Sequence, residues 1–163
     1  MREASRNKIN RNSIRKKTTQ LLQECQISNP PVKLSIILKH LGLDVIRADP
    51  KMIDTKKISA FIDLEDKFIV YSDSDPTVRK RFAIAHEVGH YLLNHITPSH
   101  VSNLNSDDPK ETEANIFAAE LLMPYEWLKK EMPWNSKIPL LAQKYWVSQE
   151  AMGWRLYKSS NLL

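Results

Sequence analysis

The chain of 163 residues is long enough for one domain with a hydrophobic core, and 42% of its residues are hydrophobic. Its single cysteine, Cys25, excludes an intrachain disulfide and a metal site dominated by thiolates. Since no apolar segment matches a transmembrane span or a signal peptide, we expect a cytoplasmic protein that does not bind membranes.

The positive charge is concentrated at the N-terminus. The net charge of +5 combines 24 basic and 19 acidic residues. Residues 1–17 hold seven basic residues and one acidic residue, a charge of +6, and the remaining 17 basic and 18 acidic residues leave the body at −1. We therefore expect a flexible basic arm at 1–17 and a single domain at 18–163. Nucleic-acid binding by the arm is not favoured, because no aromatic residue separates its charges.

The first half of the chain predicts two helices followed by a small sheet. The helices are expected over residues 13–26 and 32–41, and short strands over residues 43–46, 58–62 and 67–71. Gly42 is expected to cap the second helix at its C-terminus. The last two strands have the spacing of an antiparallel hairpin, and an exposed edge of it could bind an extended peptide.

A longer helix is predicted from Arg79 to about His95. Asp75 is expected to be its N-cap, with Pro76 at the first helical position. Gly89 is unusual inside this helix, because glycine costs about 1 kcal/mol relative to alanine there. We therefore expect another backbone or a substrate to pass close to it.

The second half predicts one polar loop and a series of helices. The loop, at about residues 97–109, is the expected mobile element. The helices are expected over residues 111–123, 125–131, 138–145 and 148–158. The order of helices, small sheet and helices indicates an α+β fold rather than an alternating one.

The longest predicted helix contains an HExxH motif, His86-Glu87-Val88-Gly89-His90. Histidines four residues apart lie on the same helix face, as two ligands of a tetrahedral metal ion require. Glu87 is placed to accept a proton from a metal-bound water. The motif is typical of zinc metallopeptidases, in which a third protein ligand completes the site and water takes the fourth position.

The candidates for the third ligand are Glu111 and Glu113 on the following helix. They are two residues apart and point in nearly opposite directions, so only one can face the metal. Helical phase alone leaves both open. Glu111 is in line with Asn115 and Ala118, whereas Glu113 lies above Glu120.

Two sequence blocks resemble the ImmA/IrrE family of metallopeptidases. They are residues 81–93, RFAIAHEVGHYLL, and residues 113–124, EANIFAAELLMP. Weaker similarity covers residues 31–45 and 140–156, but the basic segment before residue 18 has no counterpart. The resemblance implies a zincin-like fold that is mostly helical, with a small antiparallel sheet and the HExxH motif on the active-site helix.

The resemblance also implies the roles of the site residues. His86, His90 and Glu113 would bind one metal ion, and Glu87 would be the catalytic general base. Zn²⁺ is the default ion for two histidines and one glutamate, and Mn²⁺ and Fe²⁺ are also compatible.

Six further residues are candidates for stabilising an oxyanion or orienting the ligands. They are Tyr91, His95, His100, Asn115, Glu120 and Tyr125. The sequence does not choose among them. For His95, a capping or packing role is favoured because it lies off the ligand face.

Members of the ImmA/IrrE family cleave, or provoke the loss of, helix-turn-helix repressors. The resemblance therefore implies a cytoplasmic regulatory endopeptidase with a helix-turn-helix repressor as its substrate. The alternative is a non-cleaving, metal-bound module that sequesters a repressor or antitoxin. Glu87 argues against this alternative, because a purely structural metal site needs no general base.

Overall fold

The computed structural model of the protein describes residues 9–49, 59–95, 108–131 and 137–160. Within these residues the elements in chain order are α1 (Arg11–Glu24), α2 (Leu34–Leu41), β1 (Asp44–Arg47), β2 (Ala60–Asp63), β3 (Phe68–Tyr71), α3 (Thr77–Leu92), α4 (Pro109–Leu122), α5 (Tyr125–Lys129), α6 (Ile138–Tyr145) and α7 (Gln149–Ser160). This mostly helical α+β fold confirms the predicted fold class.

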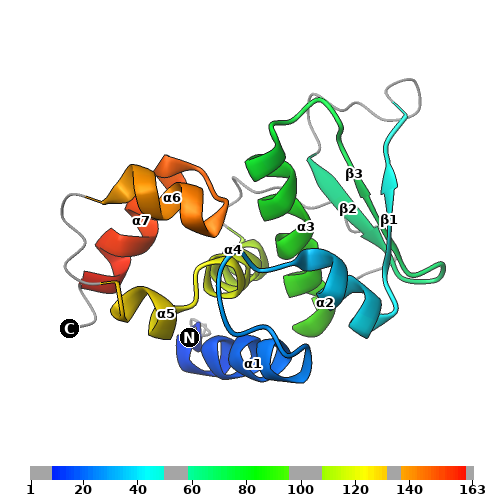
Figure 1. The fold of residues 1–163 in the computed structure, drawn as a ribbon. Helices are drawn as coiled ribbons and strands as arrows, with labels where there is room; N and C mark the ends of the chain where they lie inside the picture. Colours follow the sequence, from blue (N-terminus) through cyan, green and yellow to red (C-terminus); the bar gives the residue numbers. More distant parts are fainter. Residues whose placement is uncertain (1–8, 50–58, 96–107, 132–136, 161–163) are drawn as a thin grey trace, which may run out of the picture.

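Helix α3 lies at the centre of the molecule and connects its two sides (Figure 1). The sheet lies on one side of α3, while α4 packs on the other side with α6 and α7 beyond it. Helix α1 packs along α4, and the main core fills the space between these helices and the sheet. The residues that are most completely buried come from several elements, among them Ile37, Ile69, Phe117 and Tyr145.

The sheet has the strand order β1-β3-β2 and is mixed rather than purely antiparallel. β2 and β3 form the predicted antiparallel hairpin, with Ile62 opposite Ile69. β1 pairs with β3 in parallel, with Val45 opposite Ile69. An alternating pattern predicts that a strand exists but not its direction, because parallel and antiparallel strands share the period of two.

Helix α1 begins inside the segment that was expected to be a flexible arm. The Asn10 side chain accepts a hydrogen bond from the backbone N–H of Ser13 at 3.0 Å and so caps the helix. Ile14 and Leu21 are buried on its inner face. Residues 11–17 therefore belong to the folded domain, because their apolar side is covered even though their outer side is basic. Residues 1–8 lie outside the described residues.

The ends of α3 and α4 differ in part from the prediction. Pro76 occupies the N-cap position of α3, and Asp75 pairs with Arg79 at 3.5 Å, so the predicted capping by Asp75 is wrong. Helix α4 begins after Asp108, whose side chain accepts a hydrogen bond from the N–H of Lys110 at 2.7 Å. Residues 96–107 of the predicted mobile loop lie outside the described residues.

Helices α3 and α4 approach each other closely at Gly89. A Cβ atom at this position would lie 3.1 Å from both the Cβ and the Cδ1 atoms of Phe117, which is fully buried on α4. The group that passes closest to Gly89 is therefore the Phe117 side chain of the neighbouring helix.

A buried ion pair joins α4 to α7. Glu120 accepts hydrogen bonds from the Arg155 guanidinium and, at 3.0 Å, from the backbone N–H of Tyr125. Arg155 also donates to the carbonyl of Met123 at 3.0 Å, and Arg15 of α1 lies 3.5 Å from the Glu120 carboxylate. Four helices, α1, α4, α5 and α7, therefore meet at one carboxylate.

We expect Gly89→Ala to destabilise the protein by about 1 kcal/mol in chemical denaturation, because overpacking against Phe117 outweighs the gain in helix propensity. Gly153→Ala in α7 is the matched control. Its new Cβ would lie 4.0 Å from the nearest atom, on Ile138, so it should stabilise by up to about 1 kcal/mol. Equal effects of the two substitutions would contradict the close approach at Gly89.

Arg155→Met should destabilise the protein by about 3 kcal/mol, because it leaves the Glu120 carboxylate buried without its principal cation. The double variant Glu120→Met/Arg155→Met removes both charges and should recover a large part of this loss. Denaturation of wild type and both variants measures the two differences. A loss below about 0.5 kcal/mol in the single variant would show that the pair is energetically minor.

Candidate metal centre

His86 and His90 lie one turn apart on α3 and are both fully buried. Their Nε2 atoms are 2.9 Å apart, and their ring centroids are 4.6 Å apart with the planes inclined at 75°. The two histidines therefore present their nitrogen atoms to the same point, as their spacing of four residues predicts.

A carboxylate from the neighbouring helix completes this group. The two oxygens of Glu111, near the start of α4, lie 3.1 Å from the Nε2 of His86 and 3.2 Å from the Nε2 of His90. Glu111 is only 4% exposed. These three residues form the one cluster of potential metal ligands found in the part of the chain that the structure describes.

The spacing of the three donor residues fits a metal ion. Ligand atoms about 2.0–2.1 Å from a tetrahedral Zn²⁺ are about 3.3 Å from one another, close to the 2.9–3.2 Å between these atoms. Burial of two imidazoles beside a carboxylate also favours a cation among them, since the buried negative charge needs compensation. His86, His90 and Glu111 are thus the residues that could hold the ion.

Asn115 orients His86 through the ring nitrogen that faces away from the other candidate ligands. Its Oδ1 atom lies 2.9 Å from the Nδ1 of His86, so Nδ1–H can donate to the amide oxygen. This hydrogen bond leaves a lone pair on Nε2, the nitrogen that faces His90 and Glu111. Asn115 stands one turn after Glu111 on α4, so the same helix face supplies a ligand and a ligand-orienting group.

Glu113 occupies a different place from the one that the family resemblance indicated. Its carboxylate lies 2.9 Å from the Nε2 of His95, and its side chain is 31% exposed. His95 in turn packs edge-on against His90, with ring centroids 5.4 Å apart. Side chains two residues apart on a helix point in directions that differ by about 200°, so Glu113 cannot point inward as Glu111 does. The structure brings Glu111, and not Glu113, to the two histidines.

Glu87 is buried beside this group, at 1% exposure. It follows His86 directly on α3. Viewed along the helix axis, its side chain is therefore rotated by about 100° from that of His86 and by about 60° from that of His90. Helix geometry thus puts this buried carboxylate next to the histidines in sequence but in a different direction, as is expected for a general base that is not itself a ligand.

The remaining candidates are spread over different parts of the structure. Tyr91 is half-buried against the core, and His100 lies outside the described residues. Tyr125 packs under the Arg15 guanidinium, 4.5 Å from the ring centroid, and Glu120 binds Arg155. Tyr125 and Glu120 therefore belong to the junction of α1, α4, α5 and α7, and not to the histidine cluster.

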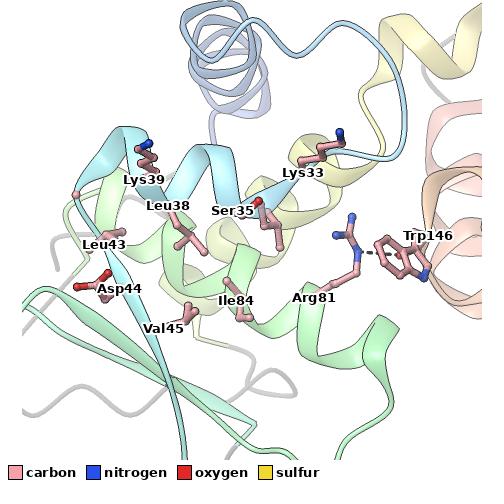
Figure 2. Close-up of a pocket in the computed structure, with 12 residues that line it drawn as sticks. Lys33, Ser35, Leu38, Lys39, Leu43, Asp44, Val45, Arg81, Ile84 and Trp146 are labelled. Atoms are coloured by element: carbon pink, nitrogen blue, oxygen red, sulfur yellow. Dashed lines mark hydrogen bonds between the residues drawn. The ribbon is translucent and has the colours of Figure 1, made fainter.

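A separate groove lies on the opposite face of α3. Figure 2 shows it between α2, β1 and α3, with an apolar base that includes Leu38, Val45 and Ile84. At one end the Arg81 guanidinium stacks on Trp146, 5.0 Å from the ring centroid, and burial lowers the pKa of Arg81. This groove does not include the His86, His90 and Glu111 group.

Comparisons with known proteins identify the family. Residues 38–157 match the Peptidase_M78 family, described as the IrrE N-terminal-like domain, over most of the chain. The chain belongs to this family. The match confirms the resemblance to ImmA/IrrE metallopeptidases. No curated protein is significantly similar to this ImmA/IrrE chain in sequence.

Solved structures support the fold of this ImmA/IrrE domain. A structure described as a Mycobacterium tuberculosis transcriptional regulator is similar, with a TM-score of 0.65 at 17% sequence identity. The similarity covers 86% of this chain and 45% of that chain, so this chain spans less than half of the regulator's length. The similarity shows a shared fold.

The two glutamates of α4 can be separated by metal analysis of this ImmA/IrrE protein. Glu111→Gln should reduce Zn²⁺ affinity by a factor of about 1000 or more, because it replaces a charged donor within the cluster. Glu113→Gln, a matched change two residues away, should reduce it by no more than about 10–100-fold, as expected for a residue outside the ligand shell. Competition with a chromogenic chelator measures both affinities, and the opposite ranking would assign Glu113 as the ligand.

Proposed function

We propose that the protein is a metal-dependent endopeptidase with His86, His90 and Glu111 as metal ligands and Glu87 as general base. The observation that carries this proposal is the buried group of two imidazoles and one carboxylate, with donor atoms 2.9–3.2 Å apart, beside a fourth buried residue that can accept a proton. Membership of a metallopeptidase family supports the same reaction class.

In this proposal, each residue of the metal centre has a separate role in hydrolysis of the peptide bond. A bound metal ion would supply Lewis acidity, which would lower the pKa of a water toward about 7 and polarise a carbonyl. Glu87 accepts the proton of the attacking water and later donates a proton to the leaving amine. Asn115 holds His86 in the tautomer whose Nε2 can bind a metal. Zn²⁺ suits this donor set best, with Mn²⁺ and Fe²⁺ as alternatives.

Strand β2 is the expected place for the substrate backbone. It is an edge strand that pairs only with β3 among the described residues, and it lies on the side of the sheet nearest to α3 (Figure 1). An extended peptide could add to its outer edge through main-chain hydrogen bonds. This arrangement would hold a peptide bond beside the helix that carries Glu87.

The proposed substrate is a helix-turn-helix repressor in the cytoplasm. Support comes from the family, whose members act on such repressors. No helix in the described part of the chain is long and apolar enough to span a membrane. The alternative, a metal-bound module that sequesters a repressor without cutting it, would not need a general base such as Glu87.

Glu87→Gln tests the proposal directly. The variant should bind Zn²⁺ like wild type but cut helix-turn-helix repressors from the same organism at least about 100-fold more slowly, because the amide cannot accept the proton. Mass spectrometry of the repressor detects the fragments, and His86→Ala serves as the control that loses the metal. If the wild type and Glu87→Gln lower repressor activity equally and no fragment appears, the sequestering module is the correct function.

A further inference from the structure

A second cleft adjoins the metal centre on the α4 side of α3. Helices α1, α3, α4 and α7 enclose this space of about 700 Å³. Its base is apolar and includes Phe82, Ile116 and Val147. Asn115, which bonds His86, also lines it, and Phe82 lies one turn before His86 on α3. The cleft therefore reaches the ligand-orienting residue of the metal centre.

Positive charge surrounds this apolar base. The cleft is lined by five basic residues, Arg11, Arg15, Arg79, Arg155 and Lys158, and by two acidic residues, Glu120 and Glu150. Glu120 is already neutralised by Arg155 and Arg15. Arg79 pairs with Asp75 at 3.5 Å, but neither Arg11 nor Lys158 forms an ion pair with any described residue. An excess of positive charge therefore remains at the rim.

An aromatic side chain stands at the rim beside these charges. Trp154 of α7 lines the cleft although it is 58% exposed, and its ring meets that of Tyr157 edge-on with centroids 6.1 Å apart. Tryptophan and arginine are among the residues that contribute most to protein-binding energies. The complementary ligand has apolar side chains for the base and carboxylates for the rim.

We propose that this cleft binds an acidic, amphipathic segment of the protein substrate, and thereby holds the substrate while a neighbouring peptide bond is cut at the metal centre. The cleavage of a neighbouring peptide bond rests on the proposed peptidase function, whereas binding of the acidic segment does not. Single-stranded nucleic acid is the less favoured ligand, because most apolar residues that line the cleft are aliphatic and Trp154 is the single exposed aromatic residue in its lining.

Binding can be measured without cleavage by using the full chain with Glu87→Gln, loaded with Zn²⁺. The probe is a fluorescein-labelled amphipathic peptide of leucine and glutamate, followed by fluorescence anisotropy, and a leucine–lysine peptide of the same pattern is its counterpart. We expect the glutamate peptide to bind at least tenfold more tightly than the lysine peptide, and its affinity to fall as salt is raised.

The residues of the cleft are tested by charge reversal at two exposed positions. Arg11→Glu/Lys158→Glu should weaken binding of the glutamate peptide about tenfold or more, and Trp154→Ala should weaken it to a similar degree. The matched control is Lys33→Glu/Lys39→Glu, which changes the net charge by the same amount at the groove of Figure 2. This control should change the affinity less than twofold. Circular dichroism verifies that all variants are folded.

Three results would overturn the proposed binding of an acidic segment in the cleft. The first is that the two double variants weaken binding of the glutamate peptide equally, and the second is that the two peptides bind equally well. The third is that a 20-nucleotide single strand binds more tightly than the glutamate peptide and that this binding is lost with Arg11→Glu/Lys158→Glu. The proposed function can fail separately. If no repressor is cut while the peptide results hold, the cleft is a docking site of a non-cleaving module. If repressor is cut at the same rate by Arg11→Glu/Lys158→Glu, the peptidase stands and the docking role is lost.

Discussion

The packing of α3 against α4 is the contact on which the rest of the molecule depends. The histidines come from α3 and the carboxylate comes from α4. In the sequence, residues 93–108 separate the two helices. Their donor atoms can lie about 3 Å apart only if the helix axes approach closely. Gly89 permits this approach, because Phe117 occupies the space that any larger side chain would need. A residue without a functional group thus sets the geometry of the site.

Much of this arrangement could be predicted from local pattern. The spacing of His86 and His90, the helix that carries them, and the hairpin before it all follow from periodicity. The capping glycine of α2 was also predictable, since Gly42 has the left-handed backbone that glycine favours, with φ of 66°. These features depend on residues close in sequence.

Features set by contacts between distant segments were harder to predict. The family motif indicates Glu113 as the third ligand, whereas the structure places Glu111 at the histidines, because Glu111 shares its helix face with Asn115 and that face packs on α3. The basic surface of α1 concealed a buried face that begins at Ile14. The parallel direction of β1 follows from the path of the chain, which alternation does not encode.

The division of the candidate ligands between two helices has a thermodynamic consequence. An ion held by His86, His90 and Glu111 would cross-link α3 and α4, and an unfolded chain could not offer the three donors together. Metal binding would then be coupled to folding, adding about 2.7 kcal/mol of stability when the free ion is at 100 times its dissociation constant. The supply of metal would thus affect what fraction of the protein is folded.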